Sequence, residues 1–389
     1  MRVFFVIPLC QSHEVRQILH SDNWKPASGL PGAILRVASY TSLLFWKWIV
    51  VKFFASLAAG FAGVLLSFGV PLAVVQAQGV APAVVQAMHP IFVLNSKDAN
   101  VSVIDPLTWK ETRRIPTGKE PHHLYLTPDE KSIIIANAAS DSLTFIDPKT
   151  AEVQRTVRGV LDPYHLRFSP DMKWFVTAAN RLNHIDIYKW DAGQMTLAKR
   201  IATARTPSHL WIDSKSTTLY ASMQDSDELV QIDLATQTLK WRGKTGPSPA
   251  DVFGTPDDRH LLVGLTGGDG VEVYDISGSA PKLVKTIKTA LGAHAFRSAG
   301  DKRHVYVSNR VGNSISKIDH QTLAVVDTYA APGGPDCMEV SSDGKFIFVT
   351  SRWARKLSVI DVTTRQLVRQ VNVGASPHGV WTLDHASRL

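Results

Sequence analysis

Cysteine is scarce in this chain. Its 389 residues include only Cys10 and Cys337. Because Cys337 alone falls within residues 88–389, that region has no intramolecular disulfide framework. The CxxCH signature of covalently attached c-type haem is also absent.

The usual signatures of catalysis are missing as well. We find no GxSxG, no HExxH, no P-loop and no GxGxxG after a predicted strand. The glycine-rich stretch "TGGDG" at 266–270 lies between two predicted strands, with no helix to complete a phosphate site, and is read as a turn. No catalytic residue is therefore assigned from the sequence, and whether the protein is an enzyme stays open.

A strong surplus of one charge is lacking too. The formal net charge is +8, but residues 1–87 hold six Lys and Arg against two Asp and Glu. Residues 88–389 then carry 36 basic and 32 acidic residues, a net charge of +4. A surplus this small argues against nucleic-acid binding, which usually requires a strongly basic field.

Charge is wholly absent from Phe53 to Ala87, and Lys47 and Lys52 precede this run. A basic start, an apolar stretch and small residues at a cut after Ala77 or Ala87 are typical of a secretory signal. Residues 47–87 are thus predicted to be a signal peptide, and the mature protein to be exported to the periplasm.

An uncleaved anchor is the alternative for the same segment. Residues 53–75 span 23 residues and could cross a bilayer, which would hold the rest of the protein outside the inner membrane. The membrane is a partner only in that case. Residues 1–46 fit neither role, and we interpret them as a non-structural upstream segment, with translation starting near Val50 or Val51.

The rest of the chain repeats. The stretch "KEPHHLYLTPDEK" at 119–131 has six counterparts downstream, with gaps of 42 or 44 residues between them. A period this regular indicates a repeat architecture. The shared position falls at Pro121, Pro163, Pro207, Pro249, Ala293, Pro335 and Pro377.

Each repeat is predicted to form four short strands, which in the second repeat cover 123–127, 132–137, 143–147 and 152–157. An aspartate ends every third strand and is expected to open the next hairpin through an Asx-turn. These aspartates are Asp105, Asp147, Asp191, Asp233, Asp275, Asp319 and Asp361.

Counting the strands predicts how the fold closes. The chain enters at a second strand near residue 91 and ends with a first strand at 378–383. Pairing of that last strand with residues 91–117 completes the last of seven blades and removes the exposed sheet edges. We therefore predict an all-β, seven-bladed β-propeller with four-stranded blades, built from residues 88–389 as one domain.

The repeat motifs resemble a known family. The tetrads "YVSN" and "FVTS" and the third strands "VIDPLT", "FIDPKT" and "VIDVTT" are similar to those of YVTN-repeat, or YncE-like, seven-bladed propellers. The resemblance implies the fold and export, but it names no reaction. A more distant resemblance exists to the tetrapyrrole-binding propeller of haem nitrite reductases, which usually has eight blades.

Histidine gathers at one place in the repeat, in the loop expected before each inner strand. Of the twelve histidines in residues 88–389, six occupy the two positions after the shared one. Histidine, cysteine and carboxylate are ligands of zinc, copper and iron, so these residues are a candidate metal site. The candidates are His122, His123, His165, His209, His294, His378, Asp251, Asp336 and Cys337.

Arginine and one tyrosine are expected at the same end of the channel. Arg181, Arg310 and Arg352 follow the second strands of three blades, and Tyr164 stands beside His165. Guanidinium groups hold carboxylates and phosphates in a fork. One hypothesis is a propeller that binds a small anionic ligand or a partner protein on this face. The other is a redox protein or cofactor-handling accessory that binds a transition metal or a haem-type tetrapyrrole.

Overall fold

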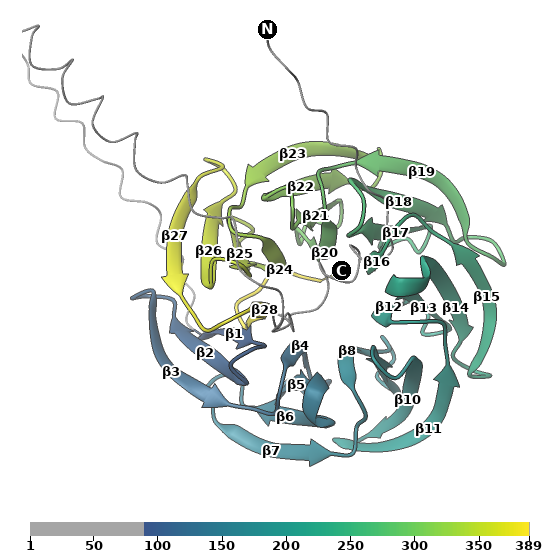
Figure 1. Ribbon diagram of the computed structural model, residues 1–389, viewed down its shortest axis with the longest axis horizontal. Coiled ribbons are helices and arrows are strands. Elements are labelled where there is room, and N and C mark those ends of the chain that lie inside the picture. Colours follow the sequence, from purple (N-terminus) through teal and green to yellow (C-terminus); the bar gives the residue numbers. More distant parts are fainter. Residues whose placement is uncertain (1–88, 389) are drawn as a thin grey trace, which may run out of the picture. The chain divides into compact units, whose positions relative to one another are not determined.

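The computed structural model describes residues 89–388, and in that range the chain forms seven four-stranded antiparallel sheets arranged in a ring (Figure 1). The predicted seven-bladed propeller is confirmed. The predicted signal or anchor at 47–87 and the upstream segment 1–46 lie outside the described residues. Within residues 89–388, no helix combines the length and apolar character needed to span a bilayer.

The seven innermost strands contact one another around the central channel. They are β4 (Pro121–Leu126), β8 (Pro163–Phe168), β12 (Pro207–Ile212), β16 (Pro249–Gly254), β20 (Ala293–Ser298), β24 (Pro335–Val340) and β28 (Pro377–Thr382). Outside them lie the second strands β1 (Ile91–Asn95), β5 (Ile133–Asn137), β9 (Trp174–Ala179), β13 (Thr218–Met223), β17 (His260–Leu265), β21 (His304–Asn309) and β25 (Phe346–Ser351).

Two further rings of strands complete the blades. The third strands are β2 (Asn100–Asp105), β6 (Ser142–Ile146), β10 (His184–Asp191), β14 (Glu228–Asp233), β18 (Gly270–Asp275), β22 (Ser314–Asp319) and β26 (Lys356–Asp361). The outer strands are β3 (Lys110–Pro116), β7 (Val153–Arg158), β11 (Gln194–Ala202), β15 (Thr238–Lys244), β19 (Lys282–Lys288), β23 (Ala324–Ala330) and β27 (Leu367–Asn372). Two short 3₁₀ turns, η1 (Ala138–Ser140) and η2 (Gln224–Ser226), follow β5 and β13.

The apolar cores lie between neighbouring blades. Phe92 and Val101 of the first blade, for example, pack in one cluster with Ile133 and Ile146 of the next. Second and third strands are buried on both faces and read as apolar runs, whereas an outer strand such as β7 is mostly exposed and polar. Stability therefore comes from blade-on-blade packing, and the inner strands are left to line the channel.

The blade is closed by the C-terminal strand. β28 pairs with β1, so the sheet that begins the domain is completed by the strand that ends it. This arrangement was predicted from the strand count. This sheet contains one strand from the C-terminal end of the domain and three from its N-terminal end. Their pairing therefore joins the two ends and closes the ring.

The aspartates at the ends of the third strands behave as predicted in six blades. Asp105 Oδ1 accepts a hydrogen bond from the backbone N–H of Leu107 at 2.8 Å, and Asp319 Oδ1 accepts one from Gln321 at 2.8 Å. Asp147, Asp233, Asp275 and Asp361 form the same kind of turn. Asp191 differs, because it pairs with Gln194 across a tight turn whose two central residues both have positive φ.

Candidate metal centre in the central channel

The histidines lie in the inner strands and not in loops before them, so that part of the sequence prediction is wrong. Each inner strand begins at the shared position, and the register to its neighbour shifts directly afterwards. In the second blade, Pro121 pairs with Asn137 and Leu124 with Ile135, so His122 and His123 together face Ala136. This is a β-bulge, which turns side chains away from the regular alternation of a strand.

The backbone before each bulge is also the same in every blade. The residue that precedes the shared position has a positive φ throughout, from Glu120 (56°) to Ser376 (54°). This left-handed residue and the proline that usually follows it start the inner strand at a fixed place. The bulged pairs are His122-His123, Tyr164-His165, Ser208-His209, Ala250-Asp251, His294-Ala295, Asp336-Cys337 and His378-Gly379.

The bulges bring six imidazoles into one layer across the channel. The ring centroids of His123 lie 4.6 Å from His165, 4.8 Å from His209 and 4.7 Å from His378. His122 stacks on His378 at 3.6 Å, and His294 lies 5.9 Å from His378. The predicted gathering of these histidines at one end of the channel is thus what the structure shows.

All six imidazoles are neutral near pH 7. Burial lowers the pKa of His122, His123, His165 and His209 well below the usual value, and neighbouring imidazoles lower it further. For His294 and His378, burial and nearby arginines bring the pKa to about 4 and about 3, although Asp336 opposes the shift. A neutral imidazole is the form that binds a metal ion.

Three of them form the most suitable ligand set, which we call the histidine triad: His123, His165 and His209, from β4, β8 and β12. Their ligand atoms all lie within 4.8 Å of one another. Nε2 of His123, Nδ1 of His165 and Nε2 of His209 are buried and have no hydrogen-bond partner among the described residues. A buried polar atom without a partner is costly, so a bound cation would stabilise this arrangement.

A hydroxyl orients one member of the histidine triad. Ser208 Oγ lies 2.9 Å from Nδ1 of His209, inside the same bulge. When Nδ1 of His209 donates its proton to this oxygen, the lone pair of His209 is on Nε2, which is buried and has no hydrogen-bond partner among the described residues. Partners of this kind fix the tautomer of metal-binding histidines.

Two of the remaining imidazoles, His294 and His378, each use one ring nitrogen in a hydrogen bond within the protein. His294 Nε2 must accept from Arg310 Nη2 at 2.6 Å, because a guanidinium can only donate, so the proton of His294 is on Nδ1, 3.0 Å from Asp336 Oδ1. His378 Nδ1 lies 2.9 Å from the carbonyl oxygen of His122 and donates to it. Both rings are thus committed to internal hydrogen bonds.

Asp336 is the centre of this second group. Its side chain is fully buried and accepts hydrogen bonds from Arg310 Nη2 at 2.7 Å and Arg352 Nη1 at 3.0 Å. Burial alone would raise the pKa of Asp336, but Arg310, His378 and His294 lower it more, so it stays well below the usual range. A metal ion here would compete with two guanidinium groups, which makes Asp336 a partner for arginine and a poor metal ligand.

The other two predicted cofactor-binding residues have different surroundings. The ring of Tyr164 stacks on His122 at 3.9 Å and lies 5.7 Å from His123, so it packs against the histidine layer. Arg181 is held away from the layer by ion pairs with Glu120 at 2.6 Å and Asp162 at 2.9 Å. Arg181 therefore braces the loops of its own and the preceding blade.

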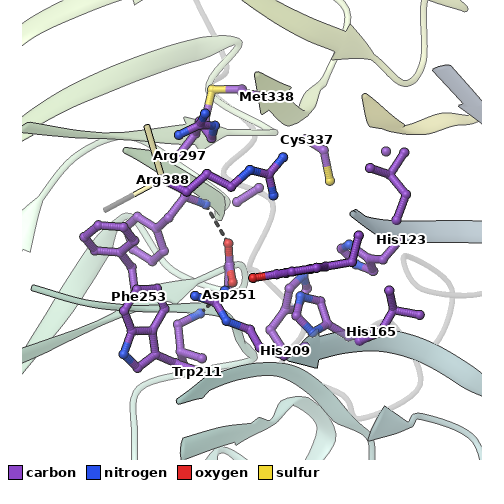
Figure 2. Close-up of a pocket in the computed structure, with 18 of the residues that line it drawn as sticks. His123, His165, His209, Trp211, Asp251, Phe253, Arg297, Cys337, Met338 and Arg388 are labelled. Atoms are coloured by element: carbon purple, nitrogen blue, oxygen red, sulfur yellow. Dashed lines mark hydrogen bonds between the residues drawn. The ribbon is translucent and has the colours of Figure 1, made fainter. Parts of the chain in front are cut away.

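A cavity of about 120 Å³ lies on the inner side of the histidine triad, and we call it the chamber (Figure 2). The histidine triad lies together on one side of it, and Asp251 and Cys337 also line it. Burial raises the pKa of the Cys337 thiol well above its usual value, and burial raises the pKa of Asp251 to about 7. Cys337 is therefore a protonated thiol, and Asp251 titrates near neutrality.

Sequence reasoning missed several residues of this region. Ser208 is not among the predicted site residues, although it precedes His209 in the bulge. Arg167 and Arg297 come from the same inner strands and line the chamber, and Arg388 reaches it from the end of the chain. Arg167 and Arg297 both lie four residues after the shared position of their repeat. This spacing points to the chamber only when the inner strand is known to face the channel.

Comparison with known proteins agrees with this architecture. The family model described as YNCE-like beta-propeller matches residues 48–388. Among curated proteins, the chain is 25% identical over 158 residues to the uncharacterized protein YncE of Salmonella typhi. That alignment covers 38% of this chain and 42% of the relative, so the chain spans less than half of the relative's length.

Solved structures are similar in fold. The periplasmic gluconolactonase PpgL of Pseudomonas aeruginosa has a TM-score of 0.66 at 17% identity, over 77% of this chain and 99% of that one. The dihydro-haem d1 dehydrogenase NirN has a TM-score of 0.57 at 18% identity, over 76% and 75% of the two chains. At these identities the likeness extends to the fold alone. With its seven blades and a match over most of its length, the chain belongs to the YncE-like β-propeller family.

Proposed function

We propose that this YncE-like propeller is an exported metal-binding protein and that a transition-metal ion binds to the histidine triad. The observation that carries the proposal is a set of three imidazoles whose ligand atoms lie within 4.8 Å of one another. Each of the three also has a buried ring nitrogen without a hydrogen-bond partner among the described residues. Export rests on the uncharged run from Phe53 to Ala87, which lies outside the described residues.

The chemistry of the site favours zinc or copper. Imidazole suits both ions, and three histidines leave a further coordination position open. In a tetrahedral zinc site the nitrogens lie roughly 3.3 Å apart, given zinc–nitrogen distances near 2.0 Å. Rotation of the imidazoles would close the remaining distance, and because the rings are already neutral, no proton has to leave first.

A haem-type tetrapyrrole does not fit the same space. The chamber holds about 120 Å³, whereas pockets for molecules of that size usually measure roughly 300 Å³ or more. Arg310 and Arg352, which could have bound propionate groups, instead hold Asp336. We therefore derive no tetrapyrrole site, and the likeness to NirN remains one of fold. A partner protein on the outer face stays a prediction from the sequence.

The test is metal titration of the apo-protein with zinc and copper(II). The wild type should bind one equivalent, and the double variant His123→Ala/His209→Ala should lose that binding while keeping its far-UV circular dichroism spectrum. The matched control is His260→Ala/His304→Ala, which removes two histidines at the starts of the second strands β17 and β21 and should bind like the wild type.

Two results would contradict the proposal. Equal binding by the wild type and the His123→Ala/His209→Ala variant would show that the metal is held elsewhere. Loss of binding in the control as well would show that the ion associates with histidine at large and not with the histidine triad.

A further inference from the structure

The last residues of the chain cross the channel at the end opposite to the histidine layer. After β28, His385 forms a β-bridge with Ser341, and the backbone N–H of Ala386 donates to the carbonyl oxygen of Val340 at 2.8 Å. Val340 ends β24, whereas Asp336 and Cys337 lie near its start. Residues 384–388, which we call the C-terminal tail, thus close the far end of the inner strands.

Ion pairs to the buried carboxylate of Glu339 fasten the C-terminal tail. Arg388 Nη2 donates to Glu339 Oε2 at 2.6 Å, and Glu339 is fully buried in an ion pair with Arg297. Arg297 also donates to the carbonyl oxygens of Ala386 at 2.6 Å and Ser387 at 3.2 Å. Charge-assisted hydrogen bonds in a buried site are strong, so the C-terminal tail is held in a defined position.

The root of the C-terminal tail is tied to the first described residue. The backbone N–H of His89 donates to Asp384 Oδ2 at 2.7 Å, and Nδ1 of the same ring lies 2.9 Å from Oδ1. Both ends of the described chain therefore meet at the tail. The C-terminal tail is held by these polar contacts, by the bridge at His385 and by Ala386, which is buried in a hydrophobic cluster. Because these contacts are local, the tail can open without disturbing the blades.

The chamber lies between the histidine triad and this tail, and its charge is positive. Arg167, Arg297 and Arg388 line it, and Asp251 is the carboxylic acid in its lining. The negative charge of Glu339 neutralises one of the two positive charges of Arg297 and Arg388, with which it forms ion pairs. Because the pKa of Asp251 is raised by burial to about 7, this carboxyl is partly neutral near pH 7 and compensates little.

We propose that the C-terminal tail is the lid of the chamber and that the chamber binds a small anion of a few non-hydrogen atoms. The volume limits the ligand to that size, and the arginine excess selects its charge. Beside a metal ion on the histidine triad, the anion would occupy the open coordination position. That last placement rests on the proposed function, whereas the lid and the anion site depend on the chamber residues alone.

Cys337 gives a direct measure of access to the chamber. In a Cys10→Ser background it is the only thiol of the chain, and it lines the chamber. Methyl methanethiosulfonate converts an accessible thiolate to a methyl disulfide and releases methanesulfinate. The labelling rate of metal-free protein, followed by mass spectrometry, should be low in the Cys10→Ser protein. It should rise about tenfold or more in Arg388→Ala, since a hydrogen bond to a charged group is lost.

A truncation after Leu383 should give the same acceleration, because it removes the lid and keeps β28 whole. The matched control is Arg303→Ala, which breaks an arginine–carboxylate pair with Asp319 away from the chamber. Tyr164→Ala opens the histidine side and shows whether the reagent enters there instead. Circular dichroism of every variant establishes that the blades are folded.

The ligand class is tested by protection. Acetate should slow the labelling of Cys337 in the Arg388→Ala protein in a saturable manner, whereas acetamide, which has the same shape without the charge, should not. Unchanged labelling in both tail variants, or acceleration by Tyr164→Ala alone, would overturn the lid. Equal effects of acetate and acetamide would overturn the anion site. Since this assay contains no metal, failure of the metal titration would leave its outcome intact.

Discussion

At the residue scale, a single hydroxyl sets the ligand atom of His209. Ser208 Oγ lies 2.9 Å from Nδ1, so the lone pair is left on the buried Nε2 when Nδ1 donates to this oxygen. Ser208→Ala removes this partner, so the proton can move to the metal-facing nitrogen. We expect zinc affinity to fall about 10- to 100-fold, the usual effect of losing a partner behind a ligand.

A competition titration with a zinc chelator measures this change. Ser140→Ala is the control, because Ser140 lies in η1, away from the histidine triad. Wild-type affinity in Ser208→Ala would mean that the protein fixes the His209 tautomer by other contacts.

Asp336 is expected to contribute to the stability of the fold and not to metal binding. It is fully buried between Arg310 and Arg352. Asp336→Asn keeps the shape but leaves two guanidinium groups without their carboxylate, and breaking such a buried pair typically costs about 3–5 kcal/mol. We expect a loss of that order in the free energy of unfolding, measured with urea at pH 7. Glu152→Gln, in an exposed pair with Arg113, should cost less than about 1 kcal/mol. Similar small losses in both variants would show that the Asp336 pairs add little.

At the element scale, the sequence predicted the blades well and the bulges not at all. A period of 42 or 44 residues and alternating apolar runs were enough to place four strands per repeat, because each blade buries the same faces. The start of the inner strand was placed two residues late, at His123 instead of Pro121. A bulge follows from the register between two strands, and that register leaves no local mark on the sequence.

The sequence also could not predict which of the histidines form hydrogen bonds within the protein. His294, Arg310 and Asp336 come from different strands and meet only after the ring closes. The sequence could therefore gather the candidates at one end of the channel. It could not separate the histidine triad from His294 and His378, each of which has one ring nitrogen in an internal hydrogen bond to Arg310 or to the carbonyl oxygen of His122.

Closure by β28 yields a prediction about that strand. Truncation after Ser376 removes the partner of β1 and leaves the edge of the first blade unpaired. It also removes His378, whose ring packs against His122. We expect a clear fall in melting temperature and a tendency to aggregate, observed by calorimetry and light scattering. The truncation after Leu383, which keeps β28 and loses only the contacts of the C-terminal tail, should melt at a higher temperature than the truncation after Ser376. If both truncated proteins melted alike, the pairing of β28 with β1 would not be what closes the ring.

At the scale of the whole molecule, the histidine layer makes stability depend on pH. The six imidazoles of the layer have pKa values below those of histidine in the unfolded chain, and the pKa values of His294 and His378 are about 4 and about 3. Below about pH 6.5 the unfolded chain takes up protons that the folded protein does not. Stability is then fully present above pH 6.5 and is lost as the pH falls toward 4, by about 1.4 kcal/mol per pH unit for each proton.

Asp251 acts in the other direction, because its raised pKa of about 7 lets the folded protein hold a proton that the unfolded chain has lost. The proton held by Asp251 in the folded protein offsets one of the six protons that the histidines take up on unfolding. Asp336, whose pKa is lowered, adds to acid sensitivity only below about pH 4, where unfolded aspartate becomes protonated. The net expectation is a steep loss of stability between pH 6.5 and 5 in the metal-free protein.

Urea unfolding at pH 7.5, 6.0 and 5.0 measures this dependence. His165→Gln/His209→Gln removes two of the titrating groups and should flatten the slope by about two protons, or about 2.7 kcal/mol per pH unit. Zinc should raise the stability of the wild type by a similar amount at all three pH values and leave the slope unchanged, because it binds only the folded site, whose imidazoles are already neutral. A metal-free protein as stable at pH 5 as at pH 7.5 would mean that water or protons reach the imidazoles in the folded state. The layer would then be an open, solvated site and not the buried one from which the metal proposal follows.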